Sequence, residues 1–475
     1  MDPDRLKKQN IKVIISEAFM VIAVIVTVIV LALLVSGYWL NSNFEIERNG
    51  MLQISSVPTG ANVEIDGQTS SWLERTNSSK ILSSGPHTVK LTKDGYDSWS
   101  KTVNVAEGLL YRLHYPRLFL QERQLESTIV TSKYTGASVS PDHNAVLLTN
   151  KTTEWAYLNL DADELSPRKL DISTVFTSVS SGEDAAPGSF DGEIVSANWD
   201  YDASHVLIES RSGDATEWVL LDINSIEKSI NLTKEFGADF SRIEIIDNNS
   251  NNLLALRNQN LHRIDLAGRS ISAVIAKHVI DFDHYNNEIV FSAHQDSSES
   301  PEKTTPGYYI GYFKLGGRDI ETLESLDAPA KVAIGKFYDS KYIVTLVDNI
   351  VTVHQEDNYE TDLSRYELSF SPNTVKVGHD GEFLLLAQDS NLATLDFEAN
   401  LVREWTIENG HYGWLDNNML YVISDGDLIV YDFDGLNRRI IAHNAMGSFP
   451  ATITNDRWLY YFSDGSLIRE WLISR

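Results

Sequence analysis

Cysteine is absent from the 475 residues of this chain. Disulfide bonds, thiolate metal sites and a cysteine nucleophile are therefore excluded. A chain of this size without disulfides must be held folded by packing alone. In an exported protein this is common in bacterial envelopes and unusual in large animal ectodomains.

Basic side chains are scarce relative to acidic ones. The sequence has 39 Lys and Arg against 67 Asp and Glu, which gives a formal net charge of −28. Such an excess repels phosphates, so it disfavours binding to nucleic acid and close adhesion to anionic lipid. Solubility is the simplest explanation of the acidity; a basic partner or loosely bound divalent cations are the alternatives.

Linear catalytic motifs are missing as well. The sequence has no His-Glu-x-x-His, no Gly-x-Ser-x-Gly, no Walker loop, no Gly-x-Gly-x-x-Gly and no Ser-x-Asp-x-Gly-x-x-Trp box. We therefore predict that the protein is not an enzyme and has no catalytic residue, no metal and no cofactor; its ligand-binding residues are unknown. Residues that converge from distant parts of the chain would escape such a search.

The densest group of possible metal ligands is His278, Asp281, Asp283 and His284. A metal site would require these side chains to converge in space. The alternative, which we prefer, is that they lie along a strand and the turn after it.

Two pairs of aspartates near the C-terminus resemble fragments of a calcium loop: Asp425 with Asp427, and Asp432 with Asp434. The further ligands and the final glutamate of such a loop are missing. Hairpin turns built around glycine explain both pairs without a metal.

Residues 18–40 form a long uncharged run, AFMVIAVIVTVIVLALLVSGYWL. At about 1.5 Å per residue, a helix of this length reaches about 35 Å, enough to cross a bilayer core of about 30 Å. Four Lys and Arg side chains precede the run, whereas only Arg48 follows it closely. The positive-inside rule then predicts a cytoplasmic tail at residues 1–17 and an extracytoplasmic remainder.

We therefore predict a single-pass signal anchor in the cell membrane. The alternative is a cleaved signal peptide, whose apolar region would normally be about 7–15 residues and would end in a small-residue cleavage site. The run here is longer and has no such site. Residues 41–48, which are polar, are expected to form a short spacer.

Residues 49–116 alternate apolar and polar side chains in four short segments separated by turns, which predicts a small β-sandwich. Residues 55–67, SSVPTGANVEIDG, and 85–96, GPHTVKLTKDGY, resemble the PEGA domain family over about residues 49–106. Pro-Thr-Gly-Ala replaces the family's Pro-Glu-Gly-Ala, and a polar loop with Trp72 replaces its usual Thr-Pro. The resemblance implies an extracytoplasmic β module without catalytic residues.

Residues 117–475 repeat one unit about every 44 residues, a period typical of four-stranded β-propeller blades. Each unit contains a short strand, a polar turn, a strand of four or five apolar residues and a strand that ends near an aspartate. Eight blades are favoured and seven are possible. The apolar strands start at Ala145, His205, Leu253, Glu288, Tyr342, Phe383, Met419 and Trp458.

The last unit has only three strands before the chain ends, so a strand from near Leu118 or from Leu125–Val130 is expected to close the ring. The segment Ser140-Pro141-Asp142 is similar to the repeats of TolB-like and other WD40-like propellers. Tryptophans recur at similar blade positions, where we expect inter-blade core; carbohydrate stacking by one or two is the alternative. They are Trp155, Trp199, Trp218, Trp405, Trp414, Trp458 and Trp471.

The predicted fold class is therefore all-β, with one transmembrane helix, a PEGA-like sandwich and a propeller. The order of these parts predicts a membrane-anchored extracytoplasmic binding or scaffold protein of a bacterial cell envelope, with the propeller contacting a protein or glycan partner. The alternatives are an envelope hydrolase with its active site in the propeller channel, and a sensor subunit of a membrane complex. The sequence does not specify the ligand or the oligomeric state.

Overall fold

The computed structural model divides the chain into two compact units, residues 1–122 (unit 1) and residues 123–475 (unit 2). Unit 1 extends six residues beyond the boundary expected at 116, because Leu120 bridges Tyr96 and the carbonyl of Phe119 accepts a hydrogen bond from the amide of Asp97 at 2.8 Å. The structure describes residues 17, 19–32, 38–40, 46–69, 75–179, 189–246, 249–295, 307–317, 319–355, 364–378 and 380–473.

The apolar run is helical over residues 19–32. No helix within the described ranges is long and apolar enough to cross a bilayer. Residues 1–16, 18 and 33–37 of the predicted tail and span lie outside the described residues. The prediction of a helix up to residue 40 is wrong at its end, because β1 (Tyr38–Leu40) is a strand paired antiparallel with β2 (Ile46–Arg48), and this pairing engages its backbone.

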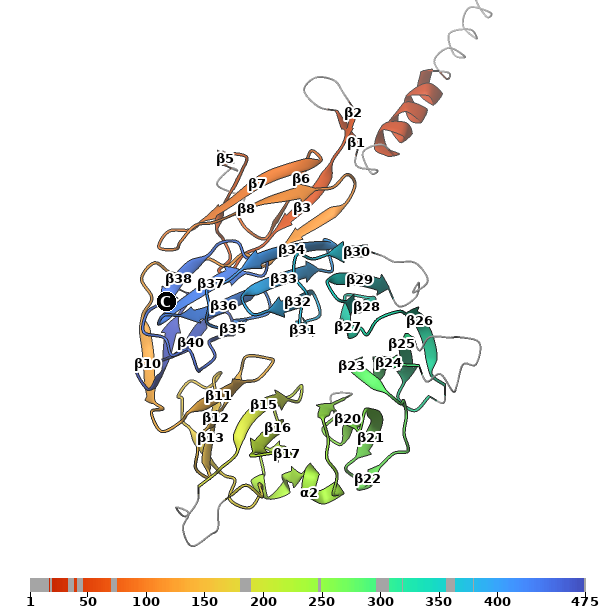
Figure 1. Ribbon diagram of the computed structural model, residues 1–475. Helices are drawn as coiled ribbons and strands as arrows, with labels where there is room; N and C mark the ends of the chain where they lie inside the picture. Colours follow the sequence, from red (N-terminus) through yellow and green to blue (C-terminus); the bar gives the residue numbers. More distant parts are fainter. Residues whose placement is uncertain are drawn as a thin grey trace, which may run out of the picture. The chain divides into compact units, whose positions relative to one another are not determined.

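The rest of unit 1 is a small sandwich of two sheets (Figure 1). One sheet has the order β6-β3-β9, with β3 antiparallel to β6 and parallel to β9; the other has the order β5-β4-β7-β8. Their inward side chains, which include Leu52, Val89 and Trp99, are fully buried between the sheets. The strands are β3 (Gly50–Ile54), β4 (Asn62–Ile65), β5 (Gln68–Thr69), β6 (Ser78–Leu82), β7 (Gly85–Thr92), β8 (Trp99–Val105) and β9 (Leu110–Leu113).

The described strands of unit 2 form eight four-stranded antiparallel sheets arranged in a ring, as Figure 1 shows. The first four blades are β11 (Gly136–Val139), β12 (Ala145–Thr149), β13 (Glu154–Asn159), β14 (Arg168–Asp171); β15 (Glu193–Trp199), β16 (His205–Ser212), β17 (Ala215–Asp222), β18 (Ile230–Asn231); β19 (Arg242–Ile245), β20 (Asn252–Arg257), β21 (Asn260–Asp265), β22 (Ser270–Ile271); and β23 (Val279–Tyr285), β24 (Glu288–His294), β25 (Tyr308–Lys314), β26 (Glu321–Leu326).

The other four blades continue around the ring. They are β27 (Lys331–Phe337), β28 (Ser340–Val347), β29 (Ile350–Gln355), β30 (Ser364–Glu367); β31 (Thr374–Val377), β32 (Phe383–Gln388), β33 (Asn391–Asp396), β34 (Leu401–Thr406); β35 (His411–Trp414), β36 (Met419–Ser424), β37 (Asp427–Asp432), β38 (Arg439–Ala442); and β39 (Thr452–Thr454), β40 (Trp458–Ser463), β41 (Ser466–Trp471), β10 (Leu125–Val130). A short helix, α2 (Leu232–Phe236), and a 3₁₀ turn, η1 (Ile226–Lys228), flank β18.

The ring closes through its last sheet, which confirms the prediction of eight blades. β10, from the start of unit 2, pairs antiparallel with β41 at the C-terminus. The indole N–H of Trp471 also donates to Glu126 at 2.5 Å, and Arg123 forms an ion pair with Glu470 at 3.0 Å. Closure leaves no unpaired edge between the first and last blades.

The predicted apolar strands are the second strands of the eight blades, and most of their side chains are buried on both faces of the sheet. A strand that is buried on both faces needs a continuous apolar run, because sheets of neighbouring blades cover it on each side. Hydrophobic clusters accordingly join successive blades, such as the cluster around Trp155 and Val206.

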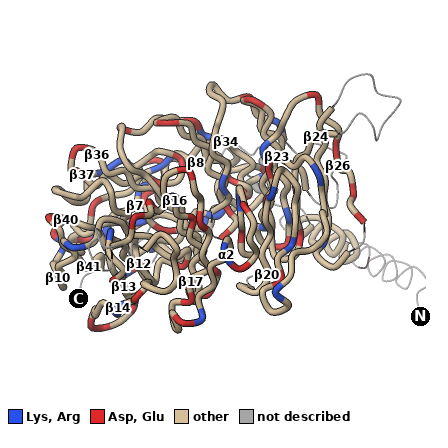
Figure 2. The backbone as a smooth tube through the Cα atoms, turned by 60° about the horizontal axis from the view of Figure 1, so that its bottom comes forward, with Lys and Arg blue, Asp and Glu red and all other residues tan. Residues whose placement is uncertain are grey.

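Acidic charge is divided unevenly between the two units. Residues 41–122 contain 8 Lys and Arg and 9 Asp and Glu, whereas residues 123–475 contain 27 and 55. Figure 2 shows the acidic residues of the propeller spread around the ring rather than gathered in one patch. Residues 1–40 add 4 basic and 3 acidic side chains, so unit 1 has no net charge and the net charge of −28 resides in unit 2.

Candidate functional site

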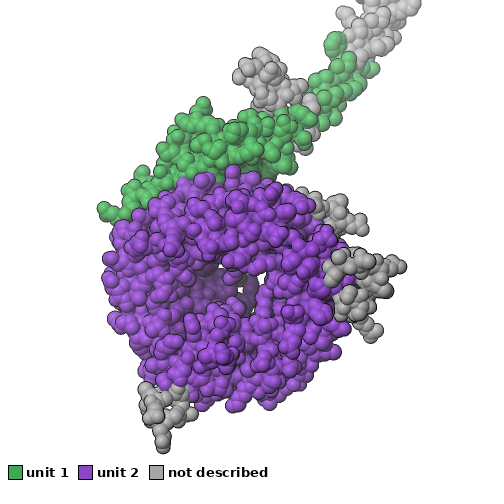
Figure 3. Space-filling view, in the orientation of Figure 1, with its two compact units in different colours: residues 1–122 green, residues 123–475 purple. Residues whose placement is uncertain are grey.

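The first strands of the blades surround a central channel, and Figure 3 shows this hollow through unit 2. Two cavities, of about 760 and 570 Å³, open along this channel. Lys376, Val377 and Gly378 line both of them. We call the larger the charged lobe, defined by Arg242, Glu244, Asp281, Asp283, His284, Lys336 and Lys376. We call the smaller the aromatic lobe, defined by His143, Trp199, His411, Trp414 and Tyr421.

One wall of the charged lobe is a network of acidic side chains around one arginine. Arg242 of β19 donates to Glu244 at 2.8 Å and to Asp281 of β23 at 2.6 Å. Its guanidinium carbon lies 4.3 Å from the centre of the Phe282 ring. His284 Nε2 is 3.7 Å from Glu244. Ion pairs between β19 and β23 thus fix the Arg242 side chain at the channel wall.

Two aspartates on this wall also connect neighbouring blades. Asp281 and Asp283 accept hydrogen bonds from the backbone amides of Val332 and Ile334 on β27, each at 2.9 Å. Residues two apart on a strand face the same way, so the spacing on β23 matches the spacing of the amides on β27. The carboxylates replace the ladder that the two strands do not form, which gives this acidic pair a structural role as well.

Asp283 differs from an ordinary surface aspartate in its readiness to hold a proton. Burial in the channel, with the negative charge of Glu244 beside it, raises the pKa of Asp283 to about 7, although the Ile334 amide and Arg242 act in the opposite direction. Near neutral pH this carboxyl is therefore able both to donate and to accept a proton.

Two lysines also line the charged lobe, Lys336 on β27 and Lys376 on β31. Neither ammonium forms a hydrogen bond or an ion pair with another residue that the structure describes. The strands approach closely here: a Cβ on Gly381, whose φ is +80°, would lie 2.1 Å from the Lys336 carbonyl oxygen. Glycine is thus required at this position on both conformational and steric grounds.

The strand interpretation of His278, Asp281, Asp283 and His284 is confirmed for three of the four residues. Asp281, Asp283 and His284 lie on β23, as the strand interpretation predicts, but His278 precedes the strand instead of following it. The His278 ring packs edge-on against His294, with 6.5 Å between centroids. Within the described ranges these four side chains do not form a cluster of metal-binding dimensions.

The aspartate pairs near the C-terminus lie at or beside turns between strands. Asp425 and Gly426 connect β36 to β37 with φ values of 50° and 83°, as the hairpin interpretation predicts. Asp427 contacts His443 at 2.7 Å. Asp432 is 1% exposed and accepts a hydrogen bond from the side-chain amide of Asn437 at 2.8 Å.

Most of the tryptophans are core residues, as predicted. Five of the seven are buried, and Trp405 and Trp414 are partly buried against a neighbouring cluster. Trp199 and Trp414 also border the aromatic lobe. The indole N–H of Trp199 donates to Ser138 at 3.0 Å, which ties two blades together at the channel.

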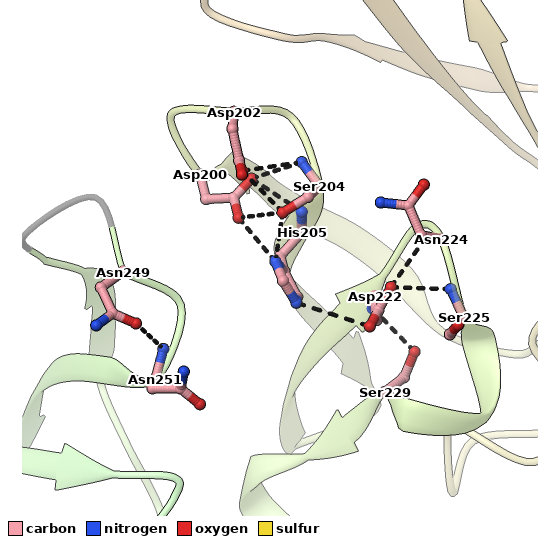
Figure 4. Close-up of polar contacts among 10 residues, drawn as sticks. All are labelled: Asp200, Asp202, Ser204, His205, Asp222, Asn224, Ser225, Ser229, Asn249 and Asn251. Atoms are coloured by element: carbon pink, nitrogen blue, oxygen red, sulfur yellow. Dashed lines mark hydrogen bonds and ion pairs between the residues drawn. The ribbon is translucent and has the colours of Figure 1, made fainter.

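Sequence reasoning missed a polar cluster at the turn between β15 and β16 (Figure 4). The Asp200 carboxylate accepts hydrogen bonds from the Ser204 hydroxyl at 3.0 Å and from the His205 backbone amide at 2.8 Å, and it contacts His205 Nδ1 at 2.8 Å. These bonds lower the pKa of Asp200 against the opposing effect of burial, and the bond to Asp200 raises the pKa of His205.

This cluster is not arranged as a hydrolytic triad. Ser204 and Asp200 both contact the same ring nitrogen of His205, whereas a triad needs the serine and the carboxylate on opposite nitrogens. Its chain position matches that of the Ser140-Pro141-Asp142 turn one blade earlier, where Ser140 and Asp142 cap the turn in the same way. Alignment of the two blades in the sequence could therefore have found this cluster, whereas a search for catalytic motifs could not.

Comparison with known proteins agrees with this architecture. Residues 49–117 match the PEGA domain family, as the resemblance implied. No curated protein matches the chain. The class of protein is thus an all-β chain in which a PEGA domain precedes a closed eight-bladed propeller.

Two solved structures with a similar fold show how remote such matches are. Oligogalacturonate lyase from Vibrio parahaemolyticus is 13% identical with a TM-score of 0.38, and the match covers 58% of this chain and 88% of that chain. Hsv2 from Kluyveromyces lactis is 9% identical with a TM-score of 0.42, and the match covers 66% and 98%. Both likenesses are remote.

Proposed function

We propose that the chain is a membrane-anchored binding protein of a bacterial cell envelope, with its propeller on the extracytoplasmic side. The helix at residues 19–32 supports the anchor. Its large apolar side chains are 47–70% exposed on all sides, and its single hydroxyl, on Thr27, donates to the Ala23 carbonyl at 2.8 Å. A helix that is apolar all round is unfavourable in water and favourable in hydrocarbon.

The charged lobe is the observation that carries the binding role. Two lysines without a partner among the described residues line the cavity of about 760 Å³ together with Glu244 and Asp283. Like-sign charges at close range cost free energy unless an oppositely charged group compensates them. The acidic side chains already have Arg242 and the β27 amides as partners, whereas the two lysines have none among the described residues. A protein or glycan segment that presents acidic groups would compensate the lysines, so we place the binding site at this lobe.

Capture experiments with the full chain test this role. Detergent-solubilised envelopes are passed over the immobilised wild-type protein and over Lys336→Gln/Lys376→Gln, which removes the charges of the two lysines and keeps most of the side-chain length. Lys228→Gln, at an exposed position on η1, is the matched control. The proposal expects a specific protein or glycan that the wild type and the control retain and the double variant loses. Retention by all three would contradict a site in the channel.

One observation favours a second function, hydrolysis in the channel. The Asp283 carboxyl has a pKa raised to about 7, and Glu244 lies close enough to influence it. A carboxyl group whose pKa lies near neutral pH is suited to general acid–base catalysis. A screen of envelope glycans and peptides, with Asp283→Asn as the test variant and exposed Glu227→Gln as the control, would support hydrolysis if turnover disappeared in the first variant alone.

A further inference from the structure

The outer face of one sheet of unit 1 is unexpectedly apolar. On the sheet β6-β3-β9, Ile81, Met51 and Leu110 lie side by side in one cross-strand row. Their exposed fractions are 60%, 41% and 39%, and Leu109, which precedes Leu110 in the chain, is 64% exposed. The three paired side chains Ile81, Met51 and Leu110 therefore form one continuous surface, which we call the apolar row.

The second sheet of the same sandwich shows what an ordinary outer face looks like. There the corresponding rows read Glu64, Lys90 and Ser100, and Thr88 beside Thr102. The two threonine hydroxyls are hydrogen bonded at 3.0 Å. Antiparallel sheets with one solvated face normally place polar residues outward, so only the sheet with the apolar row departs from the rule. Contiguous exposed apolar surface of this kind marks an interaction site.

The charge around the apolar row narrows the choice of partner. The next outward row consists of Ser79, Gln53 and Arg112, so no carboxylate stands at the outward positions of these two rows. Residues 41–122 are nearly neutral, with 8 basic and 9 acidic side chains, in contrast to the strongly acidic propeller. An apolar surface whose outward rows carry no carboxylate fits the interface of a bilayer, where apolar side chains enter the headgroup region.

The chain itself keeps this surface near a membrane. Residues 33–49 separate the apolar helix from β3, and a fully extended segment of that length reaches at most about 60 Å. A bilayer that holds the helix is thus present at high effective concentration for every molecule, which favours even a weak contact. This step rests on the proposed anchor.

We propose that the outer face of the sheet β6-β3-β9 lies on the lipid headgroup region of the membrane that holds the helix at residues 19–32. Met51, Ile81 and Leu110 enter the interface. The polar sheet β5-β4-β7-β8 faces water. The PEGA domain is then a membrane-resting module and not only a spacer.

The absence of cysteine allows a direct test on the full chain. A nitroxide is attached to a single cysteine in Ile81→Cys, in Leu110→Cys and in Thr102→Cys, the last as a matched control on the polar sheet. Each protein is reconstituted in vesicles of phosphatidylethanolamine and phosphatidylglycerol, and collision rates are measured with oxygen, which concentrates in lipid, and with a water-soluble nickel chelate.

The proposal expects a several-fold higher ratio of oxygen to nickel accessibility at positions 81 and 110 than at 102. Equal ratios at all three positions would overturn it. Protection of 81 and 110 from both reagents would also overturn it, because protein and not lipid would then cover the row. Flotation of the same vesicles separates the two claims: protein that fails to float contradicts the anchor, whereas floating protein with nickel-accessible label contradicts the apolar row alone.

Discussion

The two units expose opposite kinds of surface. Unit 1 has a nearly neutral charge and one sheet with apolar side chains facing outward, whereas the propeller carries 27 basic against 55 acidic residues. The propeller closes its ring through β10 and β41, while the sandwich keeps open sheet edges. The contrast underlies our proposal that the two units have different roles. In this proposal the sandwich contacts the membrane, and the propeller binds a protein or glycan partner.

The largest predicted effect is the loss of folding stability when one fully buried tryptophan is removed from either unit. Trp99 packs edge-on against Tyr115, and Trp155 packs against Phe176 and Phe190; both indoles are 0% exposed. Replacement by alanine should cost about 3–5 kcal/mol in either case. The small sandwich should unfold in Trp99→Ala while the larger propeller remains folded in Trp155→Ala.

Hydrogen exchange followed by mass spectrometry resolves the two units in one experiment. Trp99→Ala should lose protection over residues 49–117 and keep it in the propeller strands, and Trp99→Phe should restore most of it. Simultaneous loss of protection in both units would mean that they fold as one body, and the comparison would fail.

Substitutions at Asp283 and Asp281 in the charged lobe are expected to change the free energy of unfolding by smaller amounts and in opposite directions. Because the folded-state pKa of Asp283 is raised to about 7 from 3.8, its contribution to the unfolding free energy falls as pH rises between these values. Asp283→Asn should therefore stabilise the propeller above pH 7 by an amount on the order of 1–3 kcal/mol. Asp281→Asn should destabilise it, since Arg242 loses an ion pair.

Denaturant unfolding at acidic and at alkaline pH measures both variants. The stabilising effect of Asp283→Asn should shrink as pH falls and disappear below about pH 3, where the wild-type carboxyl is protonated in the folded and the unfolded states. A uniform loss of stability for both variants at every pH would show that the hydrogen bond to Ile334, and not the charge, dominates at this site.

The smallest predicted effect on stability comes from comparing a histidine–aspartate pair with a buried carboxylate and one with an exposed carboxylate. His205 contacts Asp200, whose side chain is 4% exposed, at 2.8 Å; His87 contacts Asp66, whose side chain is 48% exposed, at 2.7 Å. The pKa of each histidine is raised, by the hydrogen bond to Asp200 for His205 and, against the opposing effect of burial, by bonds to Asp66 and Ser83 for His87. Each pair therefore stabilises most below the unfolded pKa of about 6.5, and its contribution is lost as pH rises through the folded pKa.

Replacement of each histidine by glutamine makes this comparison measurable. His205→Gln should cost about 1 kcal/mol at pH 6 and less at pH 9, whereas His87→Gln should cost well under 1 kcal/mol because water screens its partner. Thermal unfolding at the two pH values gives both numbers. An equal cost at the two sites would remove the distinction between the buried and the exposed pair.

The sequence predicted the repeat because each blade needs one continuous apolar strand, and all eight predicted strands are second strands in the structure. Closure was also predictable, since the last unit lacked a strand that Leu125–Val130 could supply. The end of the apolar helix was not, because pairing of Tyr38–Leu40 with β2 is a tertiary interaction that overrides the apolar run.

The channel site could be predicted only in fragments. Asp281, Asp283 and His284 drew attention as neighbours in sequence. The partners of Asp281, which are Arg242 and Val332, lie on other blades, as does Lys336, which lines the same cavity. The ring brings these strands together, and no linear spacing records that arrangement. The apolar row was hidden for the same reason, because Met51, Ile81 and Leu110 become neighbours only through strand pairing.

The central claim is that the propeller stands outside the cell on a membrane anchor, and the cysteine-free chain permits a direct measurement. Leu436, which is 47% exposed in the propeller, is replaced by cysteine and treated with a membrane-impermeant maleimide in intact spheroplasts and after lysis. The account predicts full labelling before lysis and sedimentation of the labelled protein with membranes. Labelling that appears only after lysis would place the propeller inside the cell and contradict the account.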